Sequence, residues 1–132
     1  MTRQMLVAAI MVLGIIFPLQ GASGSAERSK KGFEMLEGRW LRPDGGYIVQ
    51  IRSVDSSGKI EAGYFNPRPI NVSKAQAARE SGKIKVFIEL RDTGYPGSTY
   101  TLTYDPKDDV LRGVYYQAAM RQSFDVYFTR MK

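Results

Sequence analysis

The chain has 132 residues and a formal charge of +6, and it contains neither cysteine nor histidine. This length suits a single domain. The absence of cysteine excludes disulfides and thiolate sites, and the absence of histidine removes the commonest general base and the commonest metal ligand. We therefore expect a protein that is not an enzyme and that holds no metal and no cofactor.

The first residues have the order of an export signal. Arg3 supplies a positive charge, residues 5–19 are almost entirely apolar, and small residues fill 21–26. This order is typical of a cleavable signal peptide, which we expect over residues 1–26. The alternative is a permanent membrane anchor, but the apolar run is short for a bilayer of about 30 Å. Cleavage leaves 106 residues with a charge of +5, because Arg3 is the only charge removed.

This signal sets the expected compartment. An exported domain without disulfides fits a bacterial envelope, so we expect a periplasmic or secreted protein with no stable membrane insertion after cleavage. The remaining basic residues are interleaved with acids along the chain. This spacing, together with export, argues against nucleic acid as a partner.

Residues 27–37 read as an N-terminal tail with one helical turn over 32–37, and residues 38–132 read as the domain. From Gly38 onward apolar and polar residues alternate, and Gly, Pro and Asp separate the alternating runs. This pattern predicts antiparallel strands joined by hairpins, including a turn over 94–97 that presents Tyr95 at its tip. We expect eight strands, at 38–42, 45–54, 59–65, 70–79, 83–91, 98–104, 109–117 and 122–131.

The segment 73–81 has two interpretations. Ser73 and Gln76 fit a helical capping box, and the alanines that follow suit a short helix. However, Ile70 and Val72 begin an alternating run that must pair with the next strand, so we favour a strand with a bulge near Lys74. Eight sequential hairpins predict an all-β fold, an eight-stranded antiparallel up-and-down β-barrel without free edges.

Three residues carry a resemblance to a known superfamily. Gly38-Arg39-Trp40 opens the first strand, and Arg130 lies near the end of the last strand in phase with Phe128. This pairing resembles the calycins, which comprise lipocalins, fatty-acid-binding proteins and avidins. The resemblance implies that Trp40 plugs one end of the barrel while Arg130 stacks on the indole and donates to carbonyls of the preceding turn. The ordinary alternative is a core tryptophan and a solvated arginine.

The chain also departs from these families. It lacks the lipocalin Thr-Asp-Tyr loop and C-terminal helix, and no helical lid of the fatty-acid-binding type is visible in the sequence. Its single tryptophan does not match the several that avidin pockets use, so biotin is not implied.

If Gly38, Trp40 and Arg130 close one end, a ligand site belongs at the other. Tyrosine suits such a site because its ring is apolar and its hydroxyl polar. The inward-phased polar and aromatic residues are Tyr64, Tyr100, Tyr104, Tyr115 and Gln117. The candidate ligand contacts are Tyr64 and Tyr100 from this set, Asn66 and Arg68 from the proline-flanked segment at 66–69, Tyr95 from the expected turn at 94–97, and in addition Tyr116.

Three functions fit these observations. The first is a non-catalytic exported barrel that binds a small or extended ligand at its open end. The second is a protein-binding module, such as an inhibitor of a secreted enzyme, and the third is a structural barrel whose interior is filled. The expected partner is therefore a small molecule or a secreted protein, and a cavity of roughly 300 Å³ or more would favour the small molecule.

Overall fold

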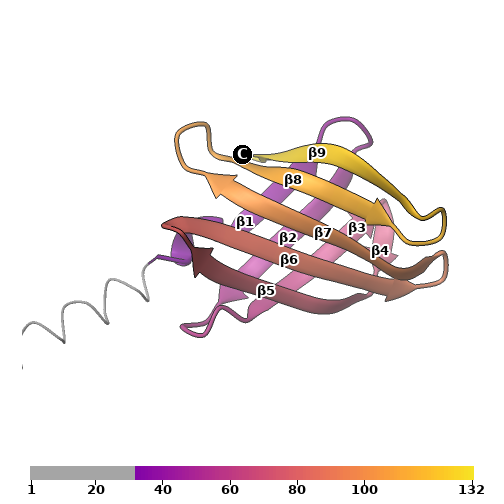
Figure 1. The fold of residues 1–132 in the computed structure, drawn as a ribbon, viewed down its shortest axis with the longest axis horizontal. Coiled ribbons are helices and arrows are strands. Elements are labelled where there is room, and N and C mark those ends of the chain that lie inside the picture. Colours follow the sequence, from indigo (N-terminus) through magenta and orange to yellow (C-terminus); the bar gives the residue numbers. More distant parts are fainter. Residues whose placement is uncertain (1–31) are drawn as a thin grey trace, which may run out of the picture. The chain divides into compact units, whose positions relative to one another are not determined.

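The structure is a computed structural model that describes residues 32–132. The expected signal peptide (1–26) and tail (27–31) lie outside the described residues. One turn of 3-10 helix, η2 (Glu34–Leu36), occupies the expected helical turn, and strands account for most of residues 38–132 (Figure 1). The strands are β1 (Gly38–Arg42), β2 (Tyr47–Val54), β3 (Ile60–Asn66), β4 (Arg68–Ile70), β5 (Val72–Glu80), β6 (Lys83–Asp92), β7 (Tyr95–Asp105), β8 (Val110–Gln117) and β9 (Gln122–Arg130).

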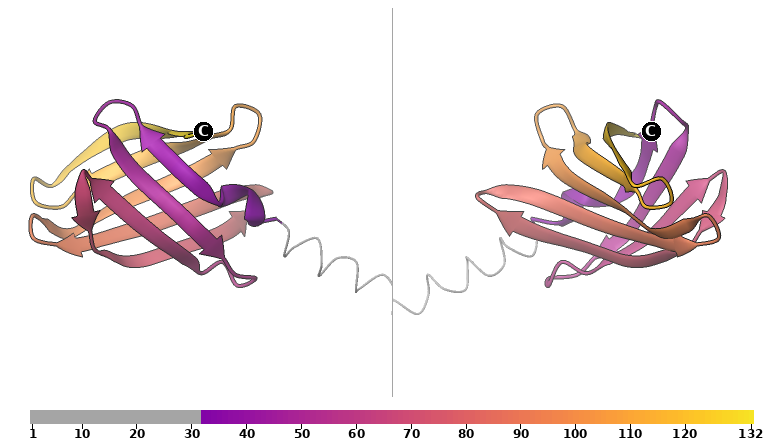
Figure 2. Two further views of the ribbon diagram at one scale, coloured as in Figure 1. Left: turned by 180° about the vertical axis from the view of Figure 1, so that it is seen from behind. Right: turned by 45° about the vertical axis from the view of Figure 1, so that its right-hand side comes forward.

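The nine strands form one antiparallel sheet in the order β4-β3-β2-β1-β9-β8-β7-β6-β5. The first and last long strands are neighbours, because β1 pairs with both β2 and β9. The sheet nearly closes on itself where β3 meets β5: Lys59 and Gln76 form a bridge, and the Ala77 amide donates to the Gly58 carbonyl at 2.7 Å. Figure 2 shows the resulting barrel from two further sides. The all-β, antiparallel barrel prediction is confirmed at this level.

The strand count of eight was wrong, because the chain forms an additional short strand. Residues 68–70 fold back on β3, and Pro69 lies opposite Phe65. Proline lacks an amide hydrogen, so it is tolerated on a strand with one unpaired edge. In the sheet order β4 is such an edge strand. The strand expected over 70–79 therefore begins later, as β5.

The structure decides two other local predictions. Residues 72–80 form a strand, and its register shifts between Val72 and Lys74, so both the strand and its bulge are confirmed. The turn expected over 94–97 lies earlier, at Thr93 and Gly94, and the placement of Tyr95 at its tip was wrong: β7 begins at Tyr95, and Pro96 pairs with Arg91. Gly97, with φ of +95°, takes up a register shift within the strand, which is why this glycine resembled a turn residue.

The barrel interior is filled by side chains from every long strand. The largest fully buried side chains are Trp40, Tyr64, Tyr100 and Phe128, followed by leucines, isoleucines and valines. The Tyr100 ring packs on Tyr115 at 4.5 Å and edge-on against Phe128 at 5.2 Å between ring centres. Because these side chains fill the interior, a site for a ligand inside the barrel can only lie at one of its two ends.

Candidate functional site

The first end of the barrel is closed by the only tryptophan of the chain. Trp40 is fully buried on β1, and its indole nitrogen donates to the Leu36 carbonyl of η2 at 2.9 Å. Arg130 is its partner in the β1–β9 pairing. The guanidinium carbon of Arg130 lies 4.3 Å from the centre of the indole. Trp40 and Arg130, two of the three residues that carry the resemblance, are therefore in direct contact.

Arg130 is also tied to the turn that covers this end. Its Nη1 donates to the Glu37 carbonyl at 2.7 Å, and its Nη2 donates to the Met35 carbonyl. Nε and Nη2 donate to the two carboxylate oxygens of Asp109 at 2.7 and 3.0 Å. These hydrogen bonds lower the pKa of Asp109 below its usual value. A guanidinium with four acceptors has little donor capacity left for a ligand, so Arg130 is occupied by contacts within the protein.

Gly38 is required by the same contact. Its φ is +139°, and a Cβ at this position would lie 2.9 Å from Nη1 of Arg130. Glycine adopts such a φ readily and leaves room for the guanidinium. All three expected closure residues, Gly38, Trp40 and Arg130, are therefore brought together.

The opposite end has a cavity of about 370 Å³ that is open to solvent. Residue positions in β1 show that this is the far end, since β1 runs from Gly38 beside Arg130 to Arg42 at the cavity, a distance of roughly 13 Å for an extended strand. We call this cavity the mouth. It is lined by Arg42, Tyr47, Tyr64, Asn66, Gly94, Tyr95, Tyr115, Gln117 and Phe124.

Arg42 is the central polar residue of the mouth. Its guanidinium carbon lies 4.3 Å from the centre of the Tyr47 ring and 5.4 Å from that of Tyr115. Nη1 donates to the Tyr100 hydroxyl at 2.9 Å, and Nε donates to Asp44 at 2.6 Å. Burial works against the charge of Arg42, but these hydrogen bonds outweigh it and raise its pKa. Only 12% of the side chain is exposed, so the charge is held in place between aromatic rings.

The floor of the mouth is a pair of tyrosines. The hydroxyls of Tyr64 and Tyr100 share a hydrogen bond of 2.7 Å. Burial raises the pKa of Tyr64 well above its usual value. Burial also raises the pKa of Tyr100 to about 12, although the hydrogen bonds from Tyr64 and Arg42 oppose this. Both phenols are therefore neutral at any physiological pH, and they act as hydrogen-bonding groups and not as bases.

The structure brings together four of the six expected ligand contacts. Tyr64, Asn66 and Tyr95 line the mouth, and the Asn66 amide donates to the Tyr95 hydroxyl. Tyr100 lies beneath them, fully buried, with its hydroxyl in the same network. Tyr95 reaches the mouth from the first position of β7, not from the tip of a turn.

The other two expected contacts lie elsewhere. Arg68 is exposed on β4 and does not line the mouth. Tyr116 is 38% exposed, and its two neighbours on β8, Tyr115 and Gln117, are the ones that reach the cavity. Strand alternation explains this, because adjacent residues point to opposite faces of a sheet.

Sequence reasoning missed the two residues that organise the mouth, Arg42 and Tyr47. Both flank the turn Pro43-Asp44-Gly45-Gly46, and residues beside a turn are usually exposed to solvent. The available signal was phase. Arg42 lies two residues after Trp40 and therefore points to the same face of β1.

The mouth offers binding chemistry. It combines one cation, several aromatic faces and two amides, which suit a small ligand with an anionic group and a flat or apolar body. In the described part of the chain, no three Asp, Glu, His or Cys side chains gather as metal ligands. Nor do residues 32–132 contain a helix with the length and apolarity to span a bilayer.

Comparison with known proteins adds no family to this description. No family model matches the chain, and neither a curated protein nor a solved structure matches it.

Proposed function

We propose that this protein is a non-catalytic, exported barrel that binds a small anionic ligand with a flat ring in its mouth. The observation that carries the proposal is the placement of Arg42, which is nearly buried between the rings of Tyr47 and Tyr115. A cation so placed costs desolvation energy that ordinary surface arginines do not pay. A ligand anion would return that energy as charge-assisted hydrogen bonds.

Arg42 has donor capacity to offer. A guanidinium carries five N–H groups. Its Nε and Nη1 have partners, whereas Nη2 donates to no acceptor among the described residues. One of the two partners, Asp44, has a side chain that is 58% exposed and can yield to a competing anion. A planar carboxylate fits a guanidinium in a bidentate way, which makes it the favoured ligand group.

The size of the mouth limits the ligand. A volume of about 370 Å³ is near the small end of ligand pockets, and the space beneath it is occupied by Tyr64 and Tyr100. A long acyl chain would have to displace these buried rings. We therefore expect a compact molecule that stacks on the mouth tyrosines and hydrogen-bonds to Asn66 or Gln117.

We also propose that the barrel belongs among calycin-like proteins. The stacked Trp40 and Arg130, with the donation from Arg130 to the turn before β1, support this proposal. Export rests on the sequence of residues 1–26 alone. Periplasmic or secreted location is therefore part of the proposal and is tested by N-terminal sequencing of the mature protein.

The experiment separates charge from ring shape. Nuclear magnetic resonance titration of the protein with benzoate, benzamide and cyclohexanecarboxylate compares an anionic ring, a neutral ring and an anion without a flat ring. Benzoate should shift the resonances of mouth residues at the lowest concentration, because it alone satisfies both Arg42 and the tyrosine faces. Native mass spectrometry of protein purified from its own host should in addition find a co-purifying small mass.

Two matched variants provide the control. Arg42→Met should abolish the benzoate shifts, whereas Arg39→Met makes the same change at an exposed position of β1 and should leave them unchanged. Equal titration by benzamide and benzoate would contradict the role of the anion. A stoichiometric protein chain in place of a small mass would favour the inhibitor function instead.

A further inference from the structure

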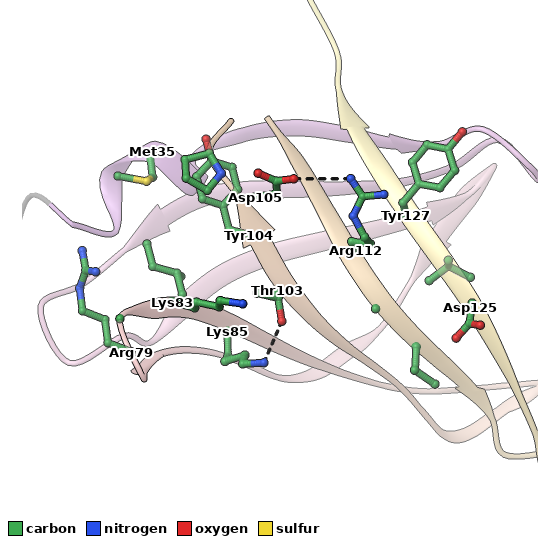
Figure 3. Close-up of a pocket in the computed structure, with 16 residues that line it drawn as sticks. Met35, Arg79, Lys83, Lys85, Thr103, Tyr104, Asp105, Arg112, Asp125 and Tyr127 are labelled. Atoms are coloured by element: carbon green, nitrogen blue, oxygen red, sulfur yellow. Dashed lines mark hydrogen bonds and ion pairs between the residues drawn. The ribbon is translucent and has the colours of Figure 1, made fainter. Parts of the chain in front are cut away.

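A second and larger depression lies on the outside of the barrel, away from the mouth. Its volume is about 1110 Å³, and it crosses β6, β7, β8 and β9 (Figure 3). We call it the outer groove. Its lining shares no residue with that of the mouth, so its function can be tested independently of the proposed one.

One row of paired residues follows the outer groove across the four strands. Lys85 is opposite Thr103 in β6–β7, Thr103 is opposite Arg112 in β7–β8, and Arg112 is opposite Tyr127 in β8–β9. All four side chains point outward, because the residues that flank them in each strand include core residues such as Leu102. Figure 3 shows these side chains on successive strands. We call these four residues the Lys85 row.

The groove carries more positive than negative charge. Arg79, Lys83 and Lys85 form no ion pair with a described carboxylate. Arg112 is shared loosely between two acids, at 3.6 Å from Asp105 and 3.9 Å from Asp108. Such long contacts at exposed side chains are weak and can be exchanged for a ligand anion. The groove is thus complementary to an anionic ligand.

The surroundings of the row restrict the kind of ligand. The backbones of β6, β7 and β8 are paired on both sides, as is that of β9, so an added peptide strand finds no free edge here. Recognition must use side chains alone. The row offers two cations, the Thr103 hydroxyl and the Tyr127 ring, which is 45% exposed. The Thr103 hydroxyl accepts a hydrogen bond from Lys85 at 2.9 Å and can still donate its own hydrogen to a ligand.

We infer that the outer groove binds an anionic polysaccharide whose sugar units carry carboxylates. Lys85 and Arg112 are two strands apart, about 9–10 Å, a separation comparable to the repeat of two sugar units in an extended chain. Carboxylates on such a chain reach both cations, ring hydroxyls reach Thr103, and a sugar face packs on Tyr127. An open groove that crosses four strands suits a polymer better than it suits a compact molecule.

Calorimetric titration with a hexamer of galacturonic acid tests this inference, and maltohexaose serves as the neutral counterpart. The acidic hexamer should bind, with an affinity that falls as salt rises, and maltohexaose should bind at least tenfold more weakly. Lys85→Gln and Tyr127→Ala should each weaken binding of the acidic hexamer roughly fivefold to tenfold. An unchanged Trp40 emission in each variant shows that the barrel remains folded.

Lys74→Gln is the matched control, because Lys74 lies on the same outer surface but outside the groove. It should leave binding within twofold of the unaltered protein. The inference is overturned if Lys74→Gln and Lys85→Gln weaken binding equally, since attraction would then be nonspecific. Tighter binding of hexaglutamate or of an oligonucleotide than of the acidic hexamer would overturn it too, as would the absence of any binding at millimolar hexamer.

Discussion

Replacing Arg130 by alanine should destabilise the barrel by about 3 kcal/mol. The two hydrogen bonds to the carbonyls of Glu37 and Met35 contribute about 1 kcal/mol each. Stacking on Trp40 at 4.3 Å contributes about 1 kcal/mol. The ion pair with Asp109 adds little, because the Asp109 side chain is 43% exposed and water screens the pair.

Trp40 provides the assay, because it is the only tryptophan and it contacts the altered side chain. In urea unfolding followed by its emission, the midpoint for Arg130→Ala should fall by about 2 M, for a slope of ~1.5 kcal/mol/M. The native emission should also shift to longer wavelength, since water gains access to the indole. Arg39→Ala, at an exposed site on the same strand, should change the stability by less than about 0.5 kcal/mol.

An Arg130→Ala protein with the same emission and the same urea midpoint would refute the reasoning. It would mean that the guanidinium contacts are replaced by water at no cost. Arg130→Lys makes the test finer, because it retains the charge and loses the planar, multidentate donor set. Its stability should fall between those of the unaltered protein and the alanine variant.

Three further predictions concern other residues. The pKa of Asp109 is lowered in the folded state, so its contribution to stability is present above the pKa of the unfolded chain and is lost as the pH falls through the folded value. In unfolding curves measured between about pH 2 and 5, Asp109→Asn should therefore lose less stability on acidification than the unaltered protein. The pKa of Tyr100 is raised to about 12, so the folded state holds this proton more tightly than the unfolded chain, and stability falls as the pH rises from about 10 to 12. Tyr100→Phe should reduce that fall in thermal unfolding measured at alkaline pH. At neutral pH the same variant should be about 1–2 kcal/mol less stable, because it loses the hydrogen bonds of the hydroxyl. Gly113→Ala should lower the free energy of unfolding by more than about 2 kcal/mol and lower the melting temperature accordingly, because the added Cβ would lie 2.0 Å from the Thr101 carbonyl oxygen. Gly46→Ala is the control: its site is open, and its φ of +74° should make the change cost only about 1 kcal/mol.

Much of the fold could be predicted from the sequence because antiparallel strands with one buried face impose a period of two. The strand 83–91 shows this directly, since Ile84, Val86, Ile88 and Leu90 are all buried. The short strand β4 has no such period. It spans three residues, one of them proline, and it exists because the chain folds back on Asn66 of β3 and not because of its own composition.

The candidate site was predicted less completely, for two physical reasons. The first is that residue type does not fix the face of a strand: Tyr116 has the side-chain chemistry of a ligand contact, but it lies between the inward-phased Tyr115 and Gln117 and therefore points outward. The second is that a charged residue next to a turn, such as Arg42, is expected to be solvated, and only the folded barrel shows that rings from other strands enclose it.

The two ends of the barrel use the same pair of groups with different results. Arg130 and Arg42 each stack on an aromatic ring at 4.3 Å. Arg130 donates four hydrogen bonds to the protein, whereas Arg42 donates two. A guanidinium whose donors are occupied fixes the structure around it, and one whose donors are partly free gains energy when an acceptor arrives. The difference in donor occupancy, more than the cavity volume, is the physical reason to place a ligand at the mouth.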